Sequence, residues 1–240
     1  MILLTVCSQS PGTDRWVRTA PKSGATPVIL MHHPYFPVPG NIVVRYIDSP
    51  YPGNLRRFLE VPPVVKALGK HRWYIWTDAC DVVIQAALMN LDELPEEVRI
   101  VPCPEDITHE ESCWKPLLMG EFATLRDKMI YNGGLFAIRG DAFIEFVEFL
   151  WESVMAAQEP VPGVIDQLLL NLFIQDRLEQ MRLIPGLFLC LDATYVTRGW
   201  ARGEPVVFNP EITRDERGFI HKSGQPYCIV HANGTTKSLL

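Results

Sequence analysis

Short apolar runs rich in β-branched and aromatic residues recur along the chain, and clusters of Pro, Gly and Asn separate many of them. Runs of this kind predict β-strands. Between some of them, apolar residues three and four positions apart predict helices. Because strands and helices alternate, the chain is expected to form an α/β sandwich. The predicted strands are residues 2–7, 27–32, 42–47, 73–77, 82–85, 98–101, 134–138, 187–191 and 227–231, and the predicted helices are 54–68, 141–158 and 164–180.

Two features refine this division into elements. Pro62 and Pro63 must break or restart the first predicted helix, because proline in a helix interior removes a hydrogen bond and clashes with the preceding turn. Residues 199–226 are rich in Gly, Pro and charged side chains, and they predict a long loop or lid before the last strand. No repeat, linker or low-complexity segment is found, so residues 1–240 are expected to form a single domain.

The composition favours a soluble protein. A net charge of -6 lacks the basic excess that drives non-specific nucleic-acid binding, although a local groove can still be positive. No apolar run approaches the roughly 18 residues of a membrane helix. Residues 1–7 are apolar but lack a basic start, and Pro11 and Gly12 follow too soon for a signal peptide. We therefore expect a cytoplasmic protein with no membrane partner, whose six scattered cysteines are reduced.

Asp78 and Asp81 interrupt the otherwise apolar stretch 73–84. A carboxylate in such surroundings needs a cation or several hydrogen-bond donors to stay ionised, and a divalent metal is the obvious candidate. Side chains three residues apart on a regular strand point to opposite faces, so both can reach one ion only if the chain turns at Ala79-Cys80. The alternative, given equal weight on these residues alone, is a turn or cap role for Asp78 and a solvated sheet edge for Asp81.

Three further segments carry polar residues next to apolar runs. The last predicted strand ends in His231, which could complete a metal's ligand set, and Gly234 and Lys237 follow it in a turn that suits a phosphate. Asn132, Gly133 and Gly134 open another strand, where a polar amide beside two glycines suits a sugar hydroxyl or a nucleotide. Asp166 and Gln167 open a helix. Taken singly, each segment has an ordinary structural interpretation, as a strand end, a turn or a helix start stabilised by the helix dipole.

In content and order, these four segments resemble the GT-A glycosyltransferases. The form Asp-x-x-Asp followed by Val-Val, together with Val-His-x-Asn-Gly-x-Thr-Lys, is similar to the glycosyltransferase domain of procollagen lysyl hydroxylases and to the procollagen galactosyl- and glucosyltransferases. Leu189-Cys-Leu-Asp192 is also similar to a strand of that family. The matching segments run from about residue 73 to 237. The resemblance implies a GT-A (Rossmann-like) mixed sheet flanked by helices.

The resemblance also implies roles for individual residues. A metal ion, Mn²⁺ (or Mg²⁺), would bridge the phosphates of a UDP-sugar, with Lys237 as a further positive charge and Asp166 as the catalytic carboxylate. Asp78 would be shared between the metal and the nucleotide ribose. The implied metal ligands are Asp78, Asp81 and His231, and the implied donor-binding residues are Asp78, Asn132, Gly133, Gly134, Gln167, Gly234 and Lys237.

The sequence departs from the family at two places. Cys80 occupies a position where animal members usually carry an aromatic residue that can stack on uracil, and Ile165 stands where the family often has an acid. The secretory signal and hydroxylase domains of the animal proteins are also missing, so collagen is not the expected acceptor. We expect a compact microbial enzyme, or a viral one acting in the host cytoplasm, whose acceptor hydroxyl belongs to a protein, a glycan or a hydroxymethylated base of phage DNA.

The remaining predictions concern the donor side. Thr5 and Val6, at the carboxyl end of the first strand, are expected to contact the nucleotide base. Arg56 and Arg57 are expected on a solvated helix face, with contact to the diphosphate as the alternative. A nucleotidyltransferase is a rival function, although residues 8–13 make a poor phosphate loop. The other rival is a non-catalytic nucleotide-sugar binding module.

Overall fold

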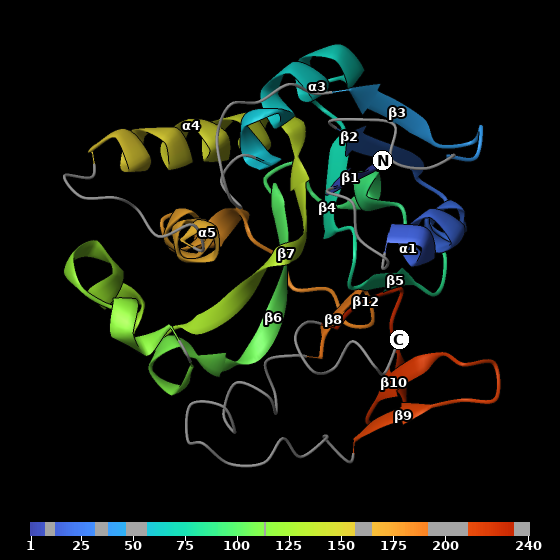
Figure 1. Ribbon diagram of the computed structural model, residues 1–240. Coiled ribbons are helices and arrows are strands. Elements are labelled where there is room, and N and C mark those ends of the chain that lie inside the picture. The colour runs from blue at the N-terminus through green and yellow to red at the C-terminus, as the bar shows by residue number, and fades with distance from the viewer. Residues whose placement is uncertain are drawn as a thin grey trace.

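The computed structural model describes residues 1–7, 13–31, 38–46, 57–112, 114–156, 165–191 and 211–232. Its centre is a six-stranded mixed sheet with the strand order β3-β2-β1-β4-β7-β6 (Figure 1). Strands β1 to β4 run parallel, whereas β7 is antiparallel to both β4 and β6. The bounds are β1 Ile2–Cys7, β2 Thr26–Met31, β3 Val43–Tyr46, β4 Trp73–Asp78, β6 Ile100–Thr108 and β7 Met129–Arg139.

Helices cover both faces of this sheet. Helix α1 (Thr13–Thr19) lies on one side, and α4 (Gly140–Ala156) and α5 (Asp166–Gln175) lie on the other, as Figure 1 shows. Helix α3 (Val61–Leu68) packs beside α4. The prediction of an α/β fold with a mixed sheet flanked by helices is therefore confirmed. In the described ranges, no helix combines the length and the apolar character that crossing a bilayer requires.

Strand β4 shows why the sheet is buried on both faces. Trp73 and Ile75 pack into the core on the α1 side, whereas Tyr74 and Trp76 pack into the core on the α3–α4 side. A strand buried on both faces has no polar positions to alternate with apolar ones, so its sequence is a continuous apolar run. Asp78, the first charged residue along this strand, lies at its carboxyl end.

The prolines at 62 and 63 define the start of α3. Both lie in its first turn, where backbone N–H groups have no partner within the helix. The predicted helix restart at Pro62-Pro63 is therefore confirmed. At the other end, Gly69 follows the last helical residue with φ of 121°.

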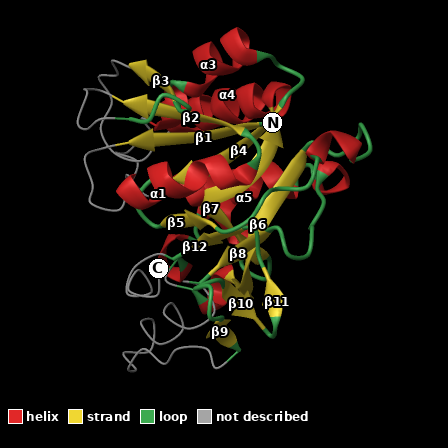
Figure 2. Cartoon of the chain, turned by 90° about the vertical axis from the view of Figure 1, so that its right-hand side faces the viewer, coloured by secondary structure: helices red, strands yellow, loops and turns green. Residues whose placement is uncertain are grey.

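Two small sheets lie beside the main one (Figure 2). The first has the order β5-β12-β8, with β12 antiparallel to β5 and parallel to β8. The second is antiparallel, with the order β11-β10-β9. Their strands are β5 Val82–Ile84, β8 Phe188–Cys190, β12 Ile229–His231, β9 Ile212–Arg214, β10 Ile220–Lys222 and β11 Gln225–Pro226.

The second small sheet corrects one prediction. Residues 199–226 were expected to form a loop or lid, but the described part of that segment, 211–226, contains β9, β10 and β11. These strands have two or three residues each and are largely exposed, so they leave no apolar run in the sequence. The turn between β10 and β11 places Ser223 and Gly224 at positive φ, which is typical of a tight hairpin.

Candidate metal centre

The two aspartates of the predicted metal pair lie on either side of a turn. Asp78 is the last residue of β4, Asp81 directly precedes β5, and the chain bends at Ala79 and Cys80. The two carboxylates can therefore reach the same place, which side chains three residues apart on a straight strand cannot do. The predicted turn at Ala79-Cys80 is confirmed.

A histidine from the C-terminal part of the chain completes the group. His231 is the last residue of β12 and lies opposite Val82 of β5 in the antiparallel register. A backbone hydrogen bond of 2.8 Å from Ala232 N to Asp81 O holds the two segments together. Asp78, Asp81 and His231 each offer one ligand atom, and these atoms all lie within 4.8 Å of one another. We call these three residues the Asp–His group.

The spacing inside the Asp–His group suits one small divalent cation. His231 Nε2 lies 3.4 Å from an oxygen of Asp81 and 3.6 Å from an oxygen of Asp78. This nitrogen is buried and forms no hydrogen bond within the described residues. Two ligand atoms that are each about 2.1 Å from a common ion lie roughly 3.0–3.5 Å apart when the ligand–metal–ligand angle is between about 90° and about 109°. The separations of His231 Nε2 from the two carboxylates are therefore close to those of atoms that share one ion.

Charges inside the site shift two pKa values in opposite directions. Burial acts to raise the pKa of Asp78, but the charge of Arg57 and the interaction with His231 outweigh it and hold that pKa below its ordinary value. Burial acts to lower the pKa of His231, but the facing carboxylates of Asp78 and Asp81 outweigh it and raise that pKa well above its ordinary value. The three side chains thus favour a positive charge between the two carboxylates, which is the charge that a cation would supply.

The glycine pair on β7 makes room for the Asp–His group and for α5. A Cβ atom at Gly134 would overlap an oxygen of Asp78 and lie 3.0 Å from Cε1 of His231. A Cβ atom at Gly133 would lie 3.2 Å from the Cα of Gln167, at the start of α5. Groups of the protein itself therefore lie close to the backbone of both glycines. Contact between these glycines and a donor sugar stays a prediction.

A buried glutamate, which no sequence motif singled out, fixes the two amides of the site. Glu105 Oε1 on β6 accepts hydrogen bonds from Asn132 Nδ2 at 2.7 Å and from Gln167 Nε2 at 3.1 Å. The amide oxygens then accept from the backbone, because Gly134 N donates to Asn132 at 2.8 Å and Gly133 N donates to Gln167 at 3.0 Å. Asn132 and Gln167 therefore hold β7 and α5 in place, and their contact with a donor stays a prediction.

An arginine, Arg57, connects Asp166 to the Asp–His group. It is the first residue of α5, and its side chain is 4% exposed. Arg57 Nη2 donates to Asp166 Oδ2 at 2.5 Å, and Arg57 Nη1 donates to Asp78 Oδ1. The guanidinium thus joins the candidate catalytic carboxylate to a candidate metal ligand. We call Arg57 with these two aspartates the site bridge.

The position of Arg57 corrects the expectation of a solvated helix face. Its guanidinium carbon lies 5.2 Å from the ring centre of Phe58 and 5.8 Å from that of Trp76, and these two rings are stacked on each other. Burial acts to lower the pKa of Arg57, but the charges of Asp78 and Asp166 outweigh it and raise that pKa. Arg57 is therefore a fixed cation inside the site, whereas Arg56 lies outside the described residues.

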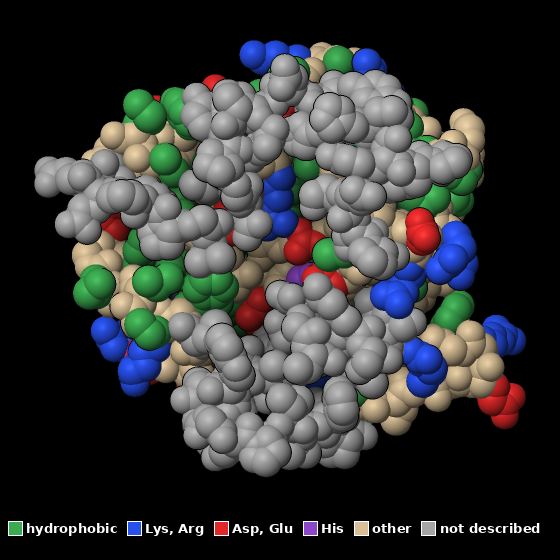
Figure 3. All heavy atoms as spheres, viewed as in Figure 1, with side chains coloured by type: hydrophobic (Ala, Val, Ile, Leu, Met, Phe, Trp, Pro, Cys, Tyr) green, Lys and Arg blue, Asp and Glu red, His purple; other side chains and the backbone are tan. Residues whose placement is uncertain are grey.

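Near the centre of the face shown in Figure 3, acidic, basic and histidine side chains lie close together. No protein-family model matches the chain, and no curated protein matches it either. The functional inference therefore depends on the residues of the site.

Two of the predicted donor residues, Gly234 and Lys237, lie outside the described residues.

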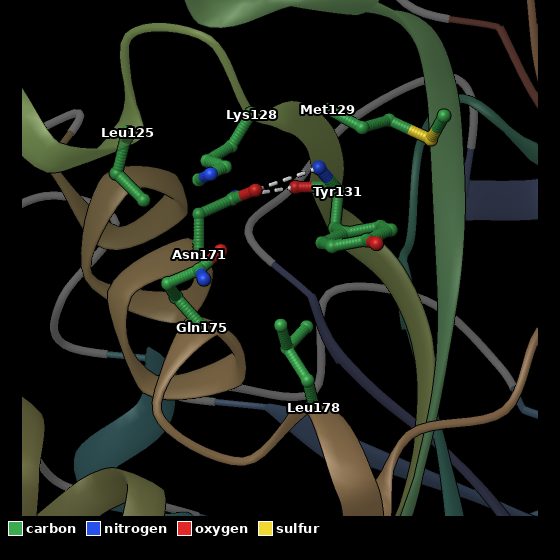
Figure 4. Close-up of a pocket in the computed structure, with 7 residues that line it drawn as sticks. All are labelled: Leu125, Lys128, Met129, Tyr131, Asn171, Gln175 and Leu178. Atoms are coloured by element: carbon green, nitrogen blue, oxygen red, sulfur yellow. Dashed lines mark hydrogen bonds between the residues drawn. The ribbon is translucent and has the colours of Figure 1, made fainter.

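Helix α5, which carries Asp166, is anchored to β7 by an asparagine. Asn171 Oδ1 accepts a hydrogen bond from Tyr131 N, and Asn171 Nδ2 donates to Tyr131 O, both at 2.7 Å (Figure 4). The same amide also donates to Gln167 O at 2.7 Å. A cavity of about 180 Å³ beside this contact (Figure 4) is lined by Leu125, Lys128, Met129, Tyr131, Asn171, Gln175 and Leu178. The double contact fixes the height of α5 along β7 and hence the position of Asp166.

The two residues predicted to contact the nucleotide base differ in their surroundings. Thr5 is fully buried, and its hydroxyl donates to Thr77 O at 2.7 Å. Its side chain therefore links β1 to β4. Val6 is half-buried and pairs with Asp78 across β1 and β4. Of the two side chains, Val6 is therefore the one placed next to the metal centre.

Proposed function

We propose that this protein is a metal-dependent glycosyltransferase with a GT-A fold, which transfers a hexose from a UDP-sugar to an acceptor hydroxyl. The observation that carries the proposal is the convergence of Asp78, Asp81 and His231 at the carboxyl end of β4, with Asp166 joined to Asp78 through Arg57. Ligands of open α/β sheets bind at this end of the strands. The resemblance of four sequence segments to the procollagen glycosyltransferases supports the donor class, and a six-stranded mixed sheet is compatible with the fold.

The donor atoms of the Asp–His group fit Mn²⁺ (or Mg²⁺). Carboxylate oxygens suit both ions, and the imidazole of His231 favours the transition metal. When bound, the ion would stabilise the negative charge that the leaving diphosphate acquires. Lys237 would add a second positive charge to the same diphosphate.

Asp166 is our candidate for the catalytic carboxylate. Its carboxylate is almost fully buried and is held by Arg57 in one orientation. A group that contacts the transferred sugar or takes up the proton of the acceptor hydroxyl needs such a fixed orientation, because small misplacements are costly in rate. The acceptor is a protein, a glycan or a hydroxymethylated base of DNA, and the last would also require base extrusion and a positive groove.

The test is release of UDP from a panel of UDP-sugars, with and without Mn²⁺, by the wild-type protein and by Asp81→Asn, Asp166→Asn and Asp141→Asn. We expect metal-dependent UDP release that falls at least about 100-fold in Asp81→Asn, because a ligand is lost. Asp166→Asn should still bind Mn²⁺ and donor but turn over about 100-fold more slowly. Asp141→Asn, at the other end of the sheet, is the matched control and should behave as the wild type.

Other outcomes would select the rival functions. Tight UDP-sugar binding without UDP release on any candidate acceptor identifies a binding module. Pyrophosphate release from a sugar phosphate and a nucleoside triphosphate identifies a nucleotidyltransferase and overturns the proposal.

A further inference from the structure

Arg57 connects two parts of the molecule that are distant in sequence. Asp78 lies 21 positions after it, at the end of β4, and Asp166 lies 109 positions after it, at the start of α5. One guanidinium contacts both carboxylates through different nitrogens. A planar guanidinium keeps its N–H groups at a fixed spacing, so it also fixes the distance between the two groups that it binds.

The two oxygens of Asp78 have different partners. Oδ1 accepts from Arg57 Nη1, whereas Oδ2 faces His231 Nε2 at 3.6 Å and lies against Gly134. A carboxylate on a single bond can rotate, and a charge-assisted hydrogen bond to one oxygen limits that rotation. Arg57 therefore orients Asp78 so that the second oxygen points into the Asp–His group.

The guanidinium is itself held in place. It lies over the stacked rings of Phe58 and Trp76, whose centres are 4.6 Å apart. Only 18% of the Arg57 side chain is exposed, and its Nε is buried with no hydrogen-bond partner among the described residues. Contacts with two carboxylates and two aromatic rings leave the guanidinium little freedom of movement.

We propose that Arg57 is a positioning residue that sets Asp78 for cation binding and holds Asp166 at a fixed place beside the cation. This inference rests on the proposed metal site. A purely electrostatic role makes the opposite prediction, because a positive charge beside a cation site weakens cation binding. If only the charge of Arg57 mattered, removing that charge would tighten cation binding. Replacing the guanidinium by an ammonium group of the same charge would change the affinity little.

The Arg57→Lys variant separates the two roles, since lysine keeps the positive charge but lacks the planar guanidinium. The experiment is Mn²⁺ titration, by calorimetry, of the wild type, Arg57→Lys, Arg57→Gln and Arg99→Lys. We expect both Arg57 variants to bind Mn²⁺ about tenfold more weakly, roughly 1.4 kcal/mol. Arg99, which also contacts two carboxylates but at the far end of the sheet, is the matched control and should give wild-type affinity.

The outcomes distinguish this inference from the proposed function. A wild-type protein that does not bind Mn²⁺ contradicts the metal site and with it the proposed function. A wild type that binds, together with an Arg57→Lys variant of equal affinity or an Arg57→Gln variant of higher affinity, overturns the positioning role alone.

A measurement on the unchanged protein covers the case in which the variants do not fold. In ¹⁵N-labelled wild type, the Arg57 guanidinium N–H signals should be protected from exchange and should remain so at saturating Mg²⁺, because the bridge persists beside the bound ion. Collapse of these signals to those of a free guanidinium on Mg²⁺ binding contradicts the inference.

Discussion

The two ends of the central strands each carry an arginine between two carboxylates, but their surroundings differ. At the carboxyl end of β4, Arg57 contacts Asp78 and Asp166, whose side chains are 22% and 4% exposed. At the opposite end, Arg99 contacts Asp141 at 3.3 Å and Glu145 at 2.7 Å, and these carboxylates are 42% and 43% exposed. The arginines themselves are almost equally covered, at 18% and 20%.

The difference therefore lies in the carboxylates rather than in the arginines. Around Arg99, water can replace either partner, so that bridge resembles an ordinary surface ion pair of low energy. Around Arg57, loss of the cation leaves one carboxylate, Asp166, that water can barely reach and another, Asp78, that is only partly exposed. The same three-residue chemistry is thus a surface contact at one end of the sheet and an integral part of a polar interior at the other.

The largest expected effect comes from two glycines that lie near these two ends. In Gly134→Ala, the new Cβ would overlap Asp78 and displace it from the Asp–His group, so Mn²⁺ affinity should fall at least about a thousandfold, or ~4 kcal/mol. In Gly140→Ala, the new Cβ would lie 2.8 Å from Lys70 O and from atoms of Tyr74 and Val65. That variant should lose about 1–3 kcal/mol of stability through overpacking but keep its Mn²⁺ affinity.

Calorimetric titration and urea unfolding, both on folded samples, measure these two quantities for each variant. Equal Mn²⁺ affinities in Gly134→Ala and the wild type contradict the role of Gly134 in making room for Asp78.

Removing the two arginines compares the bridges directly. Arg57→Gln leaves the buried Asp166 and the partly buried Asp78 without their shared cation, so the free energy of unfolding should fall by about 3 kcal/mol. Arg99→Gln should cost less than about 1 kcal/mol. Urea unfolding at pH 7 with EDTA measures both. Adding Asp166→Asn to Arg57→Gln should restore part of the loss, and equal losses from the two single variants contradict the comparison.

Glutamates at the two ends give a smaller contrast. In Glu105→Gln, the side-chain amides of Asn132 and Gln167 donate to a neutral acceptor instead of a charged one. We therefore expect the free energy of unfolding to fall by about 1–2 kcal/mol. In Glu145→Gln, the exposed contact to Arg99 weakens by less than about 0.5 kcal/mol. The same unfolding measurement applies, and a loss in Glu105→Gln no larger than in Glu145→Gln would show that the buried amide network is not held by charge.

The buried strands and the polar residues at their ends could be predicted because their signals are local, whereas the grouping of Asp78, Asp81 and His231 was implied only by the resemblance of four segments taken together. A continuous apolar run marks the buried strand β4, and a carboxylate at its end marks the place where the chain must turn. His231 follows the same rule at the end of β12. Each signal depends on a few consecutive residues, so the sequence contains it even without tertiary structure.

Arg57 and Glu105 could not be predicted because their burial depends on distant segments. Arg57 is enclosed by Trp76 and by α5, and an arginine on a helix is more often exposed. Glu105 stands between Pro104 and Asp106, where prolines suggest the end of a strand, yet β6 continues through two register shifts to Thr108. The contacts with Asn132 and Gln167 that bury Glu105 come from β7 and α5.

The smallest expected effect is a pH dependence that is specific to the buried bridge. Because Arg57 and His231 hold the pKa of Asp78 below its ordinary value, Asp78 contributes stability above its unfolded pKa of about 3.9 and loses it as pH falls below that value. In EDTA, the stability difference between the wild type and Asp78→Asn should therefore narrow by about 1 kcal/mol between pH 6 and pH 3. Measured in an Arg57→Gln background, where the main cation is gone, the same difference should change much less with pH. A gap that widens on acidification, or that narrows equally in both backgrounds, contradicts the assignment of Arg57 as the cation that keeps Asp78 ionised.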